Sequence, residues 1–162
     1  MDLRCYILCA DGYIEDAVQE ARAILLVERI VPGFLGLKAG TIEGTSGGRI
    51  PVEVLISLLI GEGGQRPLPD GLLLAGGAAC GQQMLLDPRV HLLVQHMLQA
   101  MHPVGFLHPM SYPLFDLSAK NSGDSPFLLS EKRTTAEFMR VFIRHLRQFG
   151  QGTALQKLSP LK

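Results

Sequence analysis

Three side chains that could do chemistry lie near expected turns of the chain: Glu15, Cys80 and His108. A cysteine becomes a nucleophile when a helix N-terminus or a cation lowers its pKa. Cys80 follows Gly76 and Gly77 and precedes a helical pattern, which suits that role, but no basic residue lies within several positions of it. The alternative is a passive, buried cysteine, because free cysteine is among the most buried residue types.

Other candidate groups have simpler interpretations. His108 could act as a base or bind a metal, or it could stand in a turn only because histidine tolerates unusual backbone angles. Ser111 is flanked by a methionine and a tyrosine. A nucleophile elbow needs small neighbours, so an active Ser111 is disfavoured. His91 and His96 lie on different faces of a helical pattern, and we expect no metal site and no cofactor.

Glu15 has two interpretations. With Asp16 it opens a helical pattern that runs from about Ile14 to Arg29, and acidic side chains there complement the helix dipole. Alternatively, its carboxylate lies at the mouth of a site. This would follow if the end of the first strand lies beside the strand that ends at Gly76.

The stretch from Asp70 to Tyr112 should position these groups. It contains an apolar run, a turn at Gly76–Gly77, a helical pattern from about Asp87 to Met101, and a second apolar run. Asp87 and Pro88 suit the N-cap and first position of a helix. The pattern is that of a βαβ unit, whose ligands bind at the carboxyl ends of its strands. The sequence therefore predicts a ligand pocket formed by Gly76, Gly77, Cys80, His108 and Pro109.

The rest of the chain predicts one α/β domain over residues 1–150, with a mostly parallel sheet and a loose tail over 151–162. A hairpin or another excursion of the chain is expected between Thr41 and Val54, and residues 52–60 are either strand or helix. Residues 113–133 show little pattern, and a last amphipathic helix should run from Thr134 to Gly150. The expected strands are Arg4–Cys9, Phe34–Leu37, Leu72–Ala75 and Val104–Leu107.

Composition excludes several functional classes. The chain has 162 residues, of which 47% are hydrophobic, and Lys+Arg and Asp+Glu number 15 each. These values favour a compact fold and give no basic surface for nucleic acid or for a membrane. Cys5 and Cys9 would be about 13 Å apart on one strand, too far for a disulfide. An odd number of cysteines, in a chain long enough to need no disulfide, fits a reducing, cytoplasmic setting.

Three segments together resemble the ThiJ/PfpI family of the class I glutamine-amidotransferase-like superfamily. They are Ala10–Tyr13 with the following acidic pair, Asp70–His108 with its "LLLAGG", "DPRV" and "PV" motifs, and Thr134–Phe138. The resemblance implies a flavodoxin-like, doubly wound sheet with helices on both faces, and a homodimer. It also implies, for active members, a reactive cysteine after the "PV" strand, a nearby glutamate and often a later histidine. Hydrolysis, glyoxal chemistry and chaperoning occur in the family.

The departures from this pattern lie at the reactive turn. Counted from the Pro-Val pair at 103–104, the nucleophile position is His108, and the sequence contains no further histidine before His145. The residue after the nucleophile should donate its backbone N–H to an oxyanion. Here that residue is Pro109, which has no N–H. The turn is therefore predicted to be inactive in acyl transfer.

Two functional hypotheses follow. The first is a degenerate family member that serves as a non-catalytic binding or oligomerisation module, forming a homodimer with a possible small-molecule ligand. The alternative is a hydrolase or glyoxalase-like enzyme with altered chemistry, using Cys80 or His108 with Glu15. Thiol reactivity at Cys80 separates them.

Overall fold

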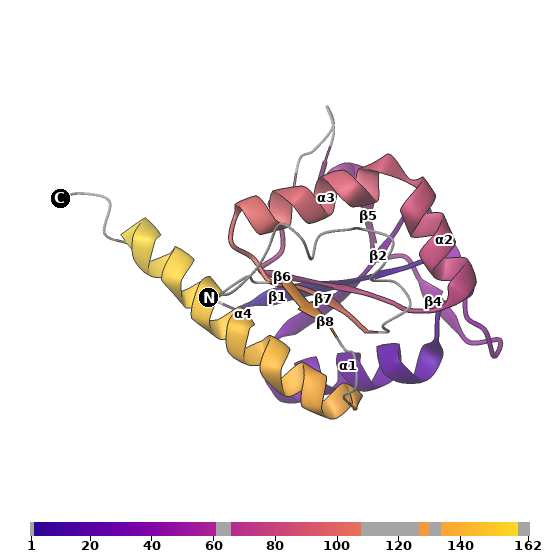
Figure 1. Ribbon diagram of the computed structural model, residues 1–162, viewed down its shortest axis with the longest axis horizontal. Coiled ribbons are helices and arrows are strands. Elements are labelled where there is room, and N and C mark those ends of the chain that lie inside the picture. The colour runs from indigo at the N-terminus through magenta and orange to yellow at the C-terminus, as the bar shows by residue number, and fades with distance from the viewer. Residues whose placement is uncertain (1, 61–65, 108–126, 130–133, 159–162) are drawn as a thin grey trace.

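The centre of the molecule is a six-stranded sheet whose strand order is β5-β2-β1-β6-β7-β8, with every neighbouring pair parallel (Figure 1). It is seen in a computed structural model that describes residues 2–60, 66–107, 127–129 and 134–158. The strands are β1 Arg4–Cys9, β2 Val31–Gly36, β5 Val54–Leu55, β6 Gly71–Leu74, β7 Val104–Phe106 and β8 Phe127–Leu129.

Helices cover both faces of this sheet. In Figure 1, α1 (Glu15–Val27) and α4 (Thr135–Leu158) lie below it, and α2 (Ala78–Leu86) and α3 (Pro88–Gln99) lie above it. The predicted doubly wound, flavodoxin-like α/β fold is therefore confirmed. A short 3₁₀ helix, η1 (Ile56–Leu58), follows β5.

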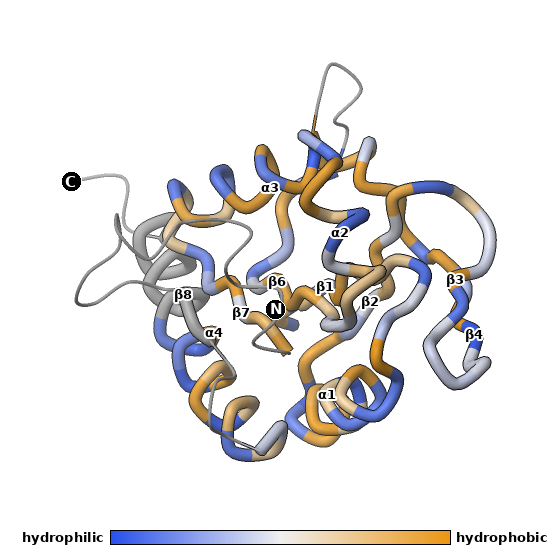
Figure 2. The backbone as a smooth tube through the Cα atoms, turned by 45° about the vertical axis from the view of Figure 1, so that its right-hand side comes forward, coloured by the Kyte–Doolittle hydropathy of each residue, from blue (hydrophilic) through white to orange (hydrophobic). Residues whose placement is uncertain are grey.

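Beyond the main sheet, β3 (Thr41–Glu43) and β4 (Arg49–Pro51) form an antiparallel hairpin, as expected between Thr41 and Val54. This β3–β4 hairpin stands at one end of the molecule (Figure 2).

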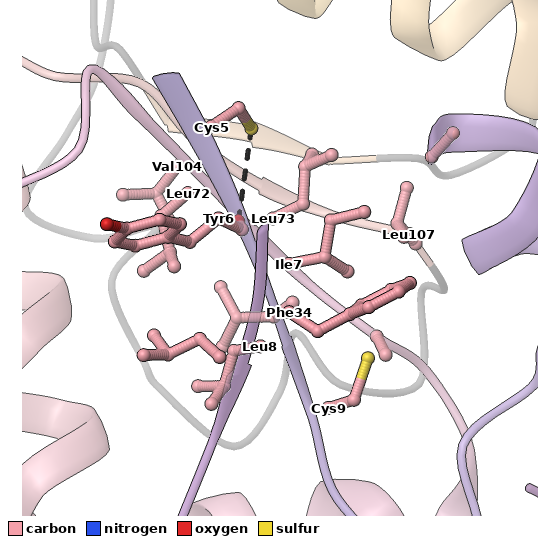
Figure 3. Packing of buried hydrophobic residues seen from close by; sticks show 14 of the residues in the cluster. Cys5, Tyr6, Ile7, Leu8, Cys9, Phe34, Leu72, Leu73, Val104 and Leu107 are labelled. Carbon is pink, nitrogen blue, oxygen red and sulfur yellow. Dashed lines mark hydrogen bonds between the residues drawn. The ribbon is translucent and has the colours of Figure 1, made fainter. Parts of the chain in front are cut away.

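The central strands are buried because helices press on both of their faces. Ile7, Leu8, Leu72, Leu73 and Val104 have no exposed surface (Figure 3). Such strands read as continuous apolar runs rather than alternating ones, and Figure 2 shows hydrophobic residues along β1, β6 and β7. The apolar runs therefore predicted these strands to within a residue or so at their ends.

Strand β2 begins earlier than predicted. It starts at Val31 and runs through Pro32 and Gly33, which the sequence suggested as a break. The short β5 pairs only with Leu35 and Gly36, so the first half of β2 has β1 as its one neighbour in the sheet. The missing N–H of Pro32 therefore costs no sheet hydrogen bond on the other side.

Two elements were missed. Helix α2 begins directly after Gly77 and places Cys80 in its first turn, not before the helix. The strong start signal at Asp87 and Pro88 is real, since Asp87 caps α3, but it marks a second helix. Strand β8 lies within residues 113–133, where little pattern was seen. Three residues are too few for a periodicity to be recognised.

Helix α4 is longer than predicted. It starts at the expected cap, where the Thr134 hydroxyl accepts from the Glu137 N–H at 3.2 Å, but it continues through Gly150 to Leu158. A glycine inside a helix costs only about 1 kcal/mol, which neighbouring helix formers can outweigh. The predicted helix end at Gly150 is therefore wrong.

None of the helices in the described part of the chain has the length and apolar character needed to cross a bilayer.

Candidate functional site

The turns that follow β1 and β6 are packed against each other, backbone to backbone. The Ile14 N–H donates to the Gly76 carbonyl at 2.9 Å. Gly77 has φ 123°, and a Cβ there would collide with the carbonyl oxygen of Gly12. A Cβ on Gly12, at φ 87°, would lie 2.7 Å from Cβ of Ala79. Gly77 of the predicted pocket, together with Gly12, thus serves close packing at the point where the strand order reverses.

Cys80 is buried below this contact. Its side chain has no exposed surface, and its Sγ lies 3.7 Å from the Ala75 carbonyl oxygen. Burial raises the pKa of the Cys80 thiol to about 12, against a lowering by the Ala10 backbone, and the charge of Asp11 adds to the rise. The position at the start of α2 therefore does not produce a thiolate, and these features are those of a passive core cysteine.

Glu15 has a role that neither interpretation anticipated. Its carboxylate accepts from the Thr45 hydroxyl at 2.9 Å, from the Ser46 N–H at 2.8 Å and from the Gly48 N–H at 2.7 Å. The Ser46 N–H is the chief cause that lowers its pKa; partial burial opposes this, and Gly48 and Thr45 lower it further. Glu15 is the first residue of α1 and ties that helix to the tip of the β3–β4 hairpin.

Tyr13 carries an unusual buried group. The residue is 0% exposed, and its hydroxyl has no hydrogen-bond partner among the described residues. Burial raises the pKa of Tyr13, and nearby Cys9 and Glu15 add to the rise. A lone buried hydroxyl costs about 1–3 kcal/mol, and the sequence offered no signal for it.

The remaining predicted site residues, His108 and Pro109, lie outside the described residues, as does the disfavoured Ser111. The structure therefore places Gly76, Gly77 and Cys80 together and does not test whether they form a ligand pocket. Within the described ranges, there is no cluster of three or more histidine, cysteine, aspartate or glutamate side chains that could hold a metal ion.

A cavity of about 600 Å³ lies at the ends of β1 and β2, between the β3–β4 hairpin and the junction of α2 with α3. Sequence reasoning missed it. The sequence offered one signal, the charged pair Asp87 and Arg89 at the start of a helix. In the structure, Arg89 donates to Asp87 Oδ2 at 2.6 Å and to the Leu37 carbonyl at 3.1 Å, so it links this junction to the end of β2. The residues around the cavity are Cys9, Ala10, Asp11, Leu37, Lys38, Thr41, Ile42, Gln83, Leu86, Asp87, Pro88 and Arg89.

No family model matches the sequence, and no curated protein matches it either. Solved structures do resemble the fold. A ThiJ/PfpI domain protein from Brachyspira murdochii has a TM-score of 0.69 at 14% identity, over 91% of this chain and 99% of that one. A DJ-1 superfamily protein from Salmonella typhimurium has a TM-score of 0.69 at 14% identity, over 94% and 98%.

The DJ-1beta protein of Drosophila melanogaster has a TM-score of 0.68 at 14% identity, over 95% of this chain and 98% of that one. The chain thus has the flavodoxin-like α/β fold of DJ-1 and ThiJ/PfpI proteins over nearly its whole length. At this identity, the likeness establishes the fold.

Proposed function

We propose that this chain is a degenerate ThiJ/PfpI-type protein that acts as a non-catalytic binding module and assembles as a homodimer. The observation that carries the first part is the state of Cys80, a buried thiol with a pKa of about 12. At neutral pH such a thiol stays protonated, and the thiolate is the nucleophile. Glu15, its suggested partner, is engaged by the hairpin.

Alkylation with iodoacetamide at neutral pH tests this part, using the Cys5→Ser/Cys9→Ser double variant so that Cys80 alone reports. We expect modification of Cys80 to be at least about a thousandfold slower in the native protein than in urea. A native rate that approaches the unfolded rate would favour the altered enzyme that uses Cys80.

The turn at His108 is proposed to be inactive because Pro109 supplies no N–H to an oxyanion. Losing one such donor costs about 2.7–4 kcal/mol of transition-state stabilisation. We expect no turnover of generic ester, amide or peptide substrates above background, and none in His108→Cys, which retains Pro109. Turnover that disappears in His108→Ala would overturn this part.

The face formed by α1 and α4 supports the homodimer. A groove of about 610 Å³ lies between these helices, over Ile24 and Ile143. Beside it Val27 is 80% exposed, a large apolar side chain open to solvent. A face of this kind is typical of protein–protein contact.

The charges on this face are separated in a way that suits a second copy. Acidic side chains such as Glu20 come from α1, while Arg140 and Arg144 come from α4 and form no ion pair with another described residue. A twofold axis would bring α1 of one copy onto α4 of the other, since an isologous interface pairs each element with its complement. The chain's zero net charge adds no long-range repulsion.

Sedimentation analysis at tens of micromolar protein tests the dimer, using variants in which the charges of the two helices are exchanged. We expect Glu20→Arg and Arg144→Glu each to weaken the dimer, and the double variant to restore it, because the swapped charges again meet opposite partners. Val27→Asp should give a monomer, with Leu92→Asp, an exposed aliphatic side chain on α3, as the control. A wild-type monomer would refute the proposed assembly.

We also propose that the protein resides in a reducing compartment, the cytoplasm. All three cysteines are free and buried, which suits a protein that needs no disulfide.

A further inference from the structure

We propose that the cavity between the β3–β4 hairpin and the α2–α3 junction binds a small zwitterion with an apolar body, the chemical class of the free aliphatic amino acids. This inference rests on the proposed binding role and names the ligand for it. The cavity, of about 600 Å³, falls within the usual size range of small-molecule sites.

The walls of the cavity supply the apolar part. Ile42 comes from the hairpin, Leu37 follows β2, and Leu86 ends α2. Leu86 is 80% exposed, an unusual degree for a leucine, at the rim of the cavity. An aliphatic side chain seated against these three would remove that surface from water, at about 25 cal/mol per Å².

Four charged side chains line the cavity, and only two of them are paired with each other. Arg89 and Asp87 are held by one another: Arg89 Nε lies 3.0 Å from Asp87 Oδ1, and its terminal nitrogen 2.6 Å from Oδ2. Asp11 and Lys38 form no ion pair with any described residue. The lining therefore offers one carboxylate and one ammonium that are free to take a ligand's opposite charges.

Asp11 is already held in position for this. One of its oxygens, Oδ1, accepts from the Glu43 N–H at 3.0 Å, which fixes the carboxylate against the hairpin and leaves the other oxygen available. Its backbone carbonyl accepts from the Gln83 side chain at 2.8 Å, so helix α2 also holds this turn. A preorganised acceptor spends less of its binding energy on ordering.

The recognition follows from these observations. A ligand ammonium would bind Asp11, its carboxylate would bind Lys38, and its aliphatic group would lie on the three apolar side chains. A ligand with one charge only would form one charge-assisted hydrogen bond in place of two, and charge-assisted hydrogen bonds are the stronger kind.

Isothermal titration calorimetry on the full chain tests the proposal with three matched probes. These are L-leucine, 4-methylpentanoate, which lacks the amine, and 3-methylbutylamine, which lacks the carboxylate. We expect leucine to bind, and each analogue to bind roughly tenfold or more weakly, the range for one lost charge-assisted bond.

Matched variants assign the two charges. Lys38→Met keeps the aliphatic stem and Asp11→Asn keeps the acceptor for Glu43, so both should fold while weakening leucine roughly tenfold or more. Leu86→Glu, at an exposed position, should weaken leucine as well. The control is Arg49→Met, which removes a cation of the same hairpin outside the cavity and should leave leucine binding unchanged.

Absence of leucine binding, equal binding of an analogue, or insensitivity to both Lys38→Met and Asp11→Asn would overturn the inference. None of these results would alter Cys80 labelling or the sedimentation of the dimer, so failure here is distinguishable from failure of the proposed function.

Discussion

The two sides of the β1 carboxyl end have opposite characters. Toward β6, the turns meet through glycines so closely that a methyl group at Gly77 would strike the Gly12 carbonyl. Toward β2, a cavity of about 600 Å³ separates the end of the strand from the α2–α3 junction. The closed side is where parallel-sheet rules put a ligand, because the strand order reverses there.

The difference shows what the neighbouring turns contribute. On the closed side, helix α2 starts directly after Gly77, three residues beyond the end of β6, and carries the buried Cys80 under the β1 turn. On the open side, Asp87 and Pro88 end α2 and start α3, and the hairpin is tied by hydrogen bonds to Glu15 of α1 and to Asp11 of the β1 turn. Whether a cavity forms at the end of a strand therefore depends on the path of the connecting segments as well as on the strand order.

The largest expected effect is on the closed side. Gly77→Ala should lower the free energy of unfolding by more than about 3 kcal/mol, because backbone strain and a collision with the Gly12 carbonyl add together. Urea denaturation measures it. Gly47→Ala is the control: its φ is also positive, at 85°, but open space surrounds it, so only about 1 kcal/mol of strain is expected. Equal losses would mean that the turns are not closely packed.

The junction on the open side should respond less. Asp87→Ala removes the cap of α3 and the partner of Arg89, and we expect a loss of about 2 kcal/mol by urea denaturation. Asp87→Asn retains a capping oxygen and loses the charge, so it should cost about half as much. If both variants cost the same, the ion pair rather than the cap holds the junction.

The closed side should also contain one unfavourable group. Tyr13→Phe removes a buried hydroxyl that has no partner among the described residues, so we expect stability to rise by about 1 kcal/mol. Thermal and urea unfolding would both report it. Tyr6→Phe, in β1, serves as the control and should change stability little, because the Tyr6 hydroxyl is not a buried group without a partner among the described residues. A clear loss in Tyr13→Phe would reveal a partner for that hydroxyl.

The smallest effect concerns the tie between α1 and the hairpin that walls the cavity. The pKa of Glu15 is lowered in the folded state, so its bonds stabilise the fold fully above the ordinary glutamate pKa of about 4.3 and are lost as pH falls through the lower folded value. Glu15→Gln should therefore be less stable than wild type at pH 7, with the gap closing below about pH 4. Asp16→Asn, its exposed neighbour, controls for the helix dipole; a gap that persists in acid would contradict this role.

Much of the fold was predictable because its signals are local. Leu72–Leu74 reads as a buried strand from composition alone, and Asp87–Pro88 marks a helix start that Asp87 does cap. The errors also have local causes: Gly150 reads as a helix end although α4 continues, and β8 is too short to show a pattern.

The candidate site was predicted far less well. Gly76, Gly77 and Cys80 do lie together, yet the use of the glycines for packing depends on Gly12, some sixty positions earlier in the chain. Glu15 was singled out for its charge, but its partners at Thr45, Ser46 and Gly48 belong to a hairpin whose placement no local pattern records.

By itself, then, the sequence determined the central strands β1, β6 and β7, their burial, and the starts of α3 and α4, because apolar runs and caps act within a few residues. The tertiary structure alone decided which side of β1 is closed and which is open, and which carboxylates remain free. Those properties depend on distances between turns that are remote in the chain. They follow from how the connected elements pack against one another, and the type of a single side chain does not determine them.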